Sequence, residues 1–246
     1  MTGNNFCALI LAAGKGTRMK SDLAKVLHPL EGKPLLHYSI TAAKNAGAEK
    51  IVVIVGHQSE VVKKKFADTG AVFVEQNLQL GTGHAVLQAK DVLKNYSGLT
   101  AILCGDVPLL KPDTITGLID YHAKSGATVT VLTTYPADPH GYGRIVNDDK
   151  KNILKIVEER DSSDDEKKIG EINTGIYCVD NSFLFAALEK ITNNNKQHEY
   201  YLTDIVEIAR REGFIVKSHI AHDYIEVMGI NTPEELARAG KYLQNN

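Results

Sequence analysis

Five short apolar runs of strand length recur in the first 135 residues of this 246-residue chain, separated by segments with helical spacing. They span residues 7–11, 51–55, 72–74, 101–104 and 129–133. Continuously apolar strands are buried on both faces, and strands that alternate with helices form parallel sheets. The pattern therefore predicts an α/β fold with a doubly wound, mostly parallel sheet. Ligands of such sheets bind outside the carboxyl ends of the strands.

Local signals mark the ends of several expected elements. Pro34 and Gly47 frame a first crossover helix over residues 35–46, because proline suits the first helical turn and glycine the end. Short alternating strands on either side of a turn at residues 147–152 predict a hairpin. Thr203 is expected to cap a helix over residues 204–211.

The C-terminal region carries one more helix start. Thr232 at the cap, Pro233 at the first helical position and Glu235 three residues after the cap form a capping box. A terminal helix is therefore expected to begin directly after Asn231.

The first apolar run leads into a loop with two glycines and two cations at residues 14–18, followed by Lys25. Such a loop offers backbone N–H groups and positive charge to a phosphate. The dinucleotide fingerprint is not met, because Met19 stands where its third glycine would be. The P-loop pattern fails as well, since Lys15 lies between the glycines. A nicotinamide or flavin cofactor and ATPase or GTPase chemistry are therefore not supported.

Three segments carry a resemblance to a known family. Residues 11–19 with Lys25 resemble the Leu-Ala-Ala-Gly-x-Gly-Thr-Arg-Met signature of the sugar-1-phosphate nucleotidyltransferases. Residues 76–85 and 193–204 are similar to segments of the UDP-N-acetylglucosamine pyrophosphorylases within that family. The resemblance extends from Phe6 to the terminal helix. It implies a Rossmann-like fold of the nucleotide-diphospho-sugar transferase type, with a small β-rich sugar-binding insertion.

The resemblance also implies a single nucleotidyltransferase domain over residues 1–246. Residues 1–135 would form its nucleotide-binding half, and residues 136–246 would form the sugar-binding half and the C-terminal helix. Members of the family commonly continue into a left-handed β-helix that acetylates glucosamine-1-phosphate. Because no hexapeptide repeat occurs before Asn246, we expect this chain to lack that domain and its acetyltransferase activity.

By the same resemblance, Arg18 and Lys25 are the catalytic cations, with Arg18 and the loop backbone on the β and γ phosphates and Lys25 near the α-phosphate. Further substrate contacts are implied for Leu11, Ala12, Ala13, Gly14 and Gly16. The nucleobase contacts implied by the resemblance are Gln76, Gly81 and Thr82, and Gln79 of the same loop is a further candidate for substrate binding. Glutamine amides suit a base edge because they carry both donors and acceptors.

Asp106 ends an apolar strand and is the first expected ligand of Mg²⁺, with Gly105 beside it as a substrate contact. Asn231 matches the family's second metal-binding position, and an amide oxygen is a suitable ligand for a hard cation. Plain turn or capping roles are the alternatives for both residues. Cys104 departs from the family, which often has an aromatic residue there.

The sugar is the ligand expected for three residues of the second half. Gly143, Glu158 and Asn173 match family positions that hold the sugar hydroxyls and the acetamido group. Glutamate and asparagine suit a polyhydroxyl ligand because they bond in fixed directions. Taken singly, Glu158 and Asn173 are as readily an acid and an amide of turns.

The implied reaction is Mg²⁺-dependent transfer of UMP from UTP to N-acetylglucosamine-1-phosphate, which gives pyrophosphate and UDP-N-acetylglucosamine, a precursor of peptidoglycan and the cell envelope. Three alternatives stay open. The chain could use another sugar-1-phosphate such as glucose-1-phosphate, use another nucleoside triphosphate, or bind nucleotide sugars as a sensor without turnover.

Composition bears on partners and location. The formal net charge is −2 and no long basic block occurs, which favours small phosphorylated ligands over nucleic acid. Three cysteines, Cys7, Cys104 and Cys178, lie far apart in apolar segments, which favours reduced thiols and the cytoplasm. No apolar stretch approaches membrane-spanning length, so no membrane role is expected. The oligomeric state is left open.

Overall fold

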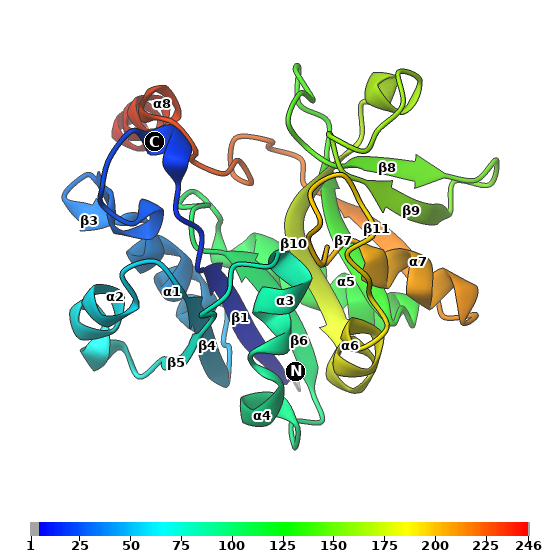
Figure 1. Ribbon diagram of the computed structural model, residues 1–246, viewed down its shortest axis with the longest axis horizontal. Helices are drawn as coiled ribbons and strands as arrows, with labels where there is room; N and C mark the ends of the chain where they lie inside the picture. The colour runs from blue at the N-terminus through cyan, green and yellow to red at the C-terminus, as the bar shows by residue number, and fades with distance from the viewer. Residues whose placement is uncertain (1–4, 246) are drawn as a thin grey trace.

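The structure is a computed structural model that describes residues 5–245 (Figure 1). Its main strands are β1 (Phe6–Ala12), β4 (Lys50–Val55), β5 (Val72–Glu75), β6 (Leu99–Cys104), β7 (Val129–Thr134), β8 (Arg144–Asn147), β9 (Ile153–Val157), β10 (Ile172–Asp180) and β11 (Val216–Ile220). Within the described range they form one nine-stranded sheet in the order β11-β7-β10-β6-β1-β4-β5, with β8 and β9 attached beside β10. A separate two-stranded sheet joins β2 (Pro29–Leu30) and β3 (Lys33–Pro34).

The pairing is mostly parallel, as the apolar runs predict. Strand β1 pairs in parallel with β4 and β6, β4 pairs with β5, and β7 pairs with β11. Strand β10 is antiparallel to both of its neighbours, β6 and β7. All five expected strands are present, with ends that differ by at most two residues, and the predicted α/β fold is confirmed.

Helices cover both faces of this sheet. The α-helices are α1 (Leu35–Asn45), α2 (Ser59–Lys65), α3 (Thr82–Leu87), α4 (Lys90–Leu93), α5 (Pro112–Ser125), α6 (Asn181–Leu188), α7 (Asp204–Arg211) and α8 (Pro233–Asn245). Short 3₁₀ turns are η1 (Thr17–Met19), η2 (Lys25–Leu27), η3 (Ala67–Thr69) and η4 (Glu166–Lys168). Ile10 packs with α1 and α5 on one face, whereas Leu9 packs with α3, α6 and α7 on the other. Successive residues of β1 thus enter two separate cores, which explains its unbroken apolar sequence.

The expected local elements are confirmed at several places. Helix α1 ends one residue before the predicted end, and Gly47 follows with a φ of 88°. The hairpin of β8 and β9 encloses the predicted turn, and α7 and α8 begin where the sequence places them.

Two peripheral units flank the carboxyl ends of β1 and β6. Helix α8 lies on one side and the β8–β9 hairpin on the other, both beyond the carboxyl ends of these strands (Figure 1). A small apolar cluster, which contains Leu30, Leu109, Ile230 and Ala239, fixes α8 against the body. This arrangement brings the segment that leads into α8 to the loop that follows β1.

No helix in the described part of the chain is long and apolar enough to cross a membrane.

Candidate active site

The loop after β1 is shaped around Lys25. Gly16 has a φ of 66°, and a Cβ atom at this position would lie 2.5 Å from the Cβ of Lys25. Only glycine combines this backbone conformation with so close an approach. Met19 is buried and anchors the following 3₁₀ turn. The absence of a side chain at Gly16 therefore lets the Lys25 side chain pack directly against this turn, which explains the glycine in the motif.

Four side chains from distant parts of the sequence meet at the carboxyl end of the sheet. The Lys25 ammonium donates to the carboxylate of Asp106 and lies 3.0 Å from Oδ1 of Asn231. Arg18 donates to the same Asn231 oxygen over 2.8 Å. Lys25 and Asp106 are mostly buried, with 15% and 19% of their side chains exposed. We call these four residues the junction cluster.

Backbone contacts hold Asp106 in the junction cluster. The Gly105 N–H donates to the carbonyl of Leu11 over 2.9 Å, which continues the ladder between β6 and β1 past the last residue of β6. The Ile230 N–H donates to the carbonyl of Asp106 over 2.8 Å. Asp106 is therefore held between the sheet and the segment that leads into α8.

Asn231 is oriented by the start of α8. Its backbone N–H and that of Thr232 donate to the carboxylate of Glu235, and the Glu235 N–H donates to the Thr232 hydroxyl. This is the predicted capping box. The Asn231 amide nitrogen donates to the carbonyl of Gly229 over 3.1 Å, which turns its oxygen toward the two cations.

Two oxygens of the junction cluster are suited to bind a divalent metal. The carboxylate of Asp106 and the amide oxygen of Asn231 converge on one ammonium group, so their lone pairs already point at a common cation. Hard cations such as Mg²⁺ take one or two protein oxygens and complete their shell with phosphate and water. No cluster of three or more His, Cys, Asp and Glu residues suited to a metal occurs within residues 5–245. A metal at this place would therefore depend on ligands from the substrate.

A cavity of about 370 Å³ lies between the β1 loop and α3. We call it the inner cavity. Most of the residues with implied phosphate or base contacts line it, namely Leu11, Ala12, Ala13, Gly14, Lys25, Gln76, Gln79, Gly81, Thr82 and Asp106. Arg18, Gly16 and Gly105 do not line the inner cavity. Arg18 reaches the site through its hydrogen bond to Asn231, and the two glycines act through the contacts described above. Gln79 donates to the carbonyl of Ala13 over 2.7 Å, so one of its amide N–H groups is already engaged.

A second cavity of about 330 Å³, the outer cavity, extends toward the β8–β9 hairpin. Arg18, Gly143, Glu158, Asn173 and Asn231 line it. Leu11, Thr82, Cys104 and Asp106 line both cavities, so the two lie next to each other. The junction cluster stands where they meet.

Cys104 forms part of the wall between the cavities. Its thiol lies 3.5 Å from the carbonyl of Gly175, and burial raises the pKa of this thiol to about 12. The group is therefore a neutral wall residue and not a nucleophile at neutral pH.

The carboxylate of Glu158 lies in the wall of the outer cavity, next to Gly143 and Thr203. A Cβ atom on Gly143 would lie 3.5 Å from the Glu158 carboxylate and 3.1 Å from the Ile156 side chain, so glycine leaves room for the carboxylate. Burial raises the pKa of Glu158, and a hydrogen bond from Thr203 opposes this shift. A partly buried carboxylate with a single long hydrogen bond from Thr203 is suited to accept hydrogen bonds from a ligand.

The expectation for Thr203 is wrong. Its hydroxyl makes no capping bond to α7 and donates to Glu158 over 3.3 Å. The partly buried carboxylate needs a donor, and this demand outweighs the local preference for a cap. Thr203 therefore lines the outer cavity, as does Tyr142, a residue that the sequence argument did not single out. The Gly-Tyr-Gly string around Tyr142 is visible in the sequence, but only the fold shows that these three residues line the outer cavity.

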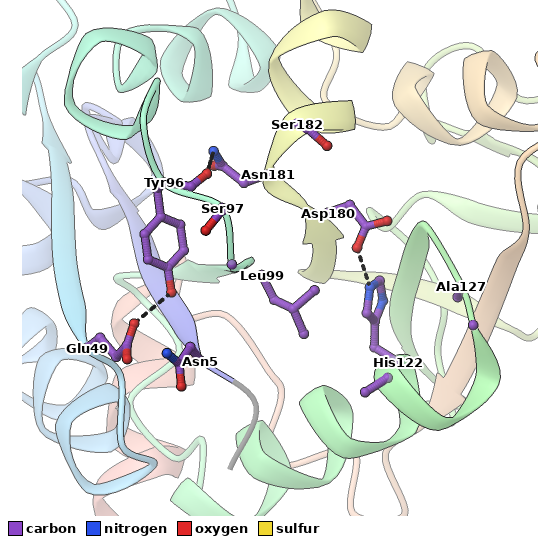
Figure 2. A pocket seen from close by; sticks show the side chains of 13 residues that line it. Asn5, Glu49, Tyr96, Ser97, Leu99, His122, Ala127, Asp180, Asn181 and Ser182 are labelled. Atoms are coloured by element: carbon purple, nitrogen blue, oxygen red, sulfur yellow. Dashed lines mark hydrogen bonds and ion pairs between the residues drawn. The ribbon is translucent and has the colours of Figure 1, made fainter. Parts of the chain in front are cut away.

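A cavity of about 640 Å³, larger than the inner and outer cavities, lies at the opposite, amino end of the sheet (Figure 2). Its polar side chains pair with one another: Tyr96 donates to Glu49 over 3.2 Å, and a His122 nitrogen lies 3.4 Å from Asp180 (Figure 2). Among the described residues that line it, two are carboxylates and none is lysine or arginine. The cavity therefore does not suit a polyphosphate, and size is a poor guide to the site here.

Comparison with known proteins identifies the family of this chain. A family model described as nucleotidyl transferase matches residues 7–225. The chain is 48% identical over 239 residues to the bifunctional protein GlmU of Geobacter metallireducens. The aligned region covers 97% of this chain and 50% of that relative. It is 45% identical to GlmU of Desulfotalea psychrophila, over 98% of this chain and 71% of that relative. The chain spans about half the length of most of the curated relatives it matches.

The fold has a solved counterpart. A crystal structure of UDP-glucose pyrophosphorylase complexed with UDP-glucose superposes with a TM-score of 0.77 at 19% identity, over 98% of this chain and 100% of that one. At this identity the likeness shows the shared fold.

Proposed function

The chain belongs to the nucleotidyl transferase family and is a nucleotidyltransferase, and from this premise we propose that it transfers UMP from UTP to N-acetylglucosamine-1-phosphate. The products are UDP-N-acetylglucosamine and pyrophosphate. The full-length relatives carry the name of a bifunctional protein, and the proposal concerns only the part that this chain matches.

The observation that carries the proposal is the junction cluster. Two cations, a carboxylate and an amide oxygen stand between a cavity that suits a nucleotide and one that suits a polyhydroxyl ligand. Two anionic substrates that meet at this point need their charges neutralised there. A sensor that only binds has no need of this arrangement at the contact between its two ligands.

Positioning and charge neutralisation are the chemistry that these residues supply. A phosphate monoester is already an anionic nucleophile, so no side chain has to activate it, and the barrier lies in bringing two polyanions together in line. We assign Arg18 and the backbone of the glycine loop to the β and γ phosphates. Lys25 lines the inner cavity and contacts Asp106, which lines both cavities, and we assign Lys25 to the charge that develops around the α-phosphorus.

Family membership implies a divalent cation, and we propose Mg²⁺ held by Asp106 and Asn231. When bound, it supplies further neutralisation of phosphate charge. The Lys25 ammonium lies between the same two oxygens, so it has to yield part of its contact with Asp106 to the metal. Gly143, Glu158, Asn173 and Thr203 are assigned to the sugar.

We further propose that residues 1–135 and 136–246 are the nucleotide and sugar halves of one domain, and that the protein acts in the cytoplasm. The three free thiols, Cys7, Cys104 and Cys178, support the location, because cytoplasmic thiols are kept reduced.

A pyrophosphate-release assay tests the function. Each of the four nucleoside triphosphates is paired with N-acetylglucosamine-1-phosphate, glucosamine-1-phosphate and glucose-1-phosphate, with and without Mg²⁺. We expect turnover with UTP, N-acetylglucosamine-1-phosphate and Mg²⁺ to exceed every other combination. A clear preference for another pair reassigns the substrates, and binding without pyrophosphate release in any combination contradicts the enzyme.

A further inference from the structure

Gln76 is more buried than Gln79 and Thr82, the other polar side chains of its loop that line the inner cavity, with 4% of its surface exposed. Its side-chain nitrogen lies 3.0 Å from the carbonyl oxygen of Gly81 and 3.0 Å from Nδ1 of His84. A carbonyl oxygen only accepts hydrogen bonds, so the atom that faces it is the amide nitrogen. The two contacts occupy both N–H groups of this amide.

The oxygen of the Gln76 amide is thereby left for a ligand. Among the described residues, no donor contacts it in the structure. Gln76 lines the inner cavity, whereas His84 does not. His84 therefore acts on the cavity through Gln76 and has no direct contact with it.

His84 has to be neutral, with its proton on Nε2, to accept from Gln76. A second amide, that of Gln88, lies 3.2 Å from Nε2 and also donates to the backbone carbonyl of His84 over 2.9 Å. A neutral imidazole has one acceptor nitrogen, and Gln76 has the stronger demand for it because it is buried, whereas Gln88 also reaches solvent. Burial lowers the pKa of His84, which favours the neutral ring.

We infer that His84 is a positioning residue for base selection: its Nδ1 holds the Gln76 amide so that only the amide oxygen faces the base. This inference rests on the proposed function. Uracil presents an N3–H donor, which an oxygen accepts. Cytosine presents an unprotonated N3 acceptor at the same place, so the two acceptors would oppose each other.

The experiment compares UTP with CTP, which share ribose and triphosphate and differ only in the base. The variants are His84→Leu, which removes the acceptor, and His84→Asn, whose side-chain oxygen takes the place of Nδ1. Gln88→Leu is the matched control, because it removes the other partner of His84 without touching Gln76. The ratio of kcat/KM for the two nucleotides and their binding constants by calorimetry are measured for each folded variant.

We expect the preference for UTP to fall at least about tenfold in His84→Leu, the size of one misplaced hydrogen bond at a buried group. In His84→Asn and Gln88→Leu it stays within about threefold of the parent. Equal loss in both His84 variants, or retention in both, overturns the inference. If the parent binds UTP but releases no pyrophosphate, the proposed function fails, while the binding ratios still decide the role of His84.

Discussion

Replacement of Lys25 by alanine tests the proposed chemistry most directly. The Lys25 ammonium contacts Asp106 and Asn231 and is only slightly exposed, so its charge acts in a medium much less polar than water. Truncation removes a cation from the place where phosphate charge is to be held. It also leaves the carboxylate of Asp106 without its cationic partner at that place.

Two contributions set the expected size. Loss of one preorganised donor to developing charge lowers turnover by roughly 10²–10³, or about 3–4 kcal/mol in the barrier. The Asp106 carboxylate, now without the Lys25 cation, adds repulsion toward phosphate, of about 3–4 kcal/mol at roughly 4–5 Å if the effective dielectric constant is about 20. Metal binding to Asp106 relieves much of this repulsion. We therefore expect kcat to fall by roughly 10²–10³ in Lys25→Ala at saturating Mg²⁺.

The assay is steady-state pyrophosphate release with UTP and N-acetylglucosamine-1-phosphate, together with thermal unfolding to verify the fold. Lys15→Ala is the matched control, because Lys15 lies in the same loop but lines neither the inner nor the outer cavity. Its turnover is expected to stay within about threefold of the parent, as is usual for a solvated surface charge. A loss below tenfold in a folded Lys25→Ala protein, or equal losses in both variants, would refute the reasoning.

Three further predictions concern the metal, the sugar and stability. Asp106→Asn lowers the apparent affinity for Mg²⁺ by at least about tenfold, and an unchanged Mg²⁺ titration of activity would show that Asp106 is not a ligand. Glu158→Gln raises KM for the sugar phosphate by about tenfold and leaves KM for UTP within twofold, since Glu158 lines the outer cavity and not the inner one. A parallel rise in both constants would contradict a sugar-specific role. Burial and the negative charges of Glu207 and Asp161 raise the pKa of Asp204 to about 6, above its unfolded value. The contribution of Asp204 to the free energy of unfolding is therefore fully present below about pH 4 and is lost as pH rises through 6. Asp204→Asn therefore raises Tm at pH 7.5 and leaves it unchanged near pH 4, and calorimetry that finds the same shift at both values would exclude this cause.

Local sequence was a sound guide wherever neighbours along the chain supply the interaction. The capping box of Thr232 and Glu235 forms as expected, because its partners lie three residues apart. Thr203 shows the limit of this approach, since the carboxylate that claims its hydroxyl lies 45 residues earlier in the chain. Side-chain roles that depend on a distant partner cannot be read from a capping preference alone.

By itself, the sequence determined the strands, the glycine loop and the residue types that suit phosphate, base and sugar, because apolar periodicity and backbone conformation are local properties. Tertiary structure alone decided that Arg18 and Asn231, 213 residues apart, share one hydrogen bond and that Asp106, the partner of Lys25, lines two neighbouring cavities. It also decided the orientation of the Gln76 amide, which follows from a histidine on the next helix. The physical reason is that the order and register of the strands bring distant loops together at the carboxyl ends of the strands. Only there do the charged and hydrogen-bonding side chains of these loops come within hydrogen-bond distance of each other.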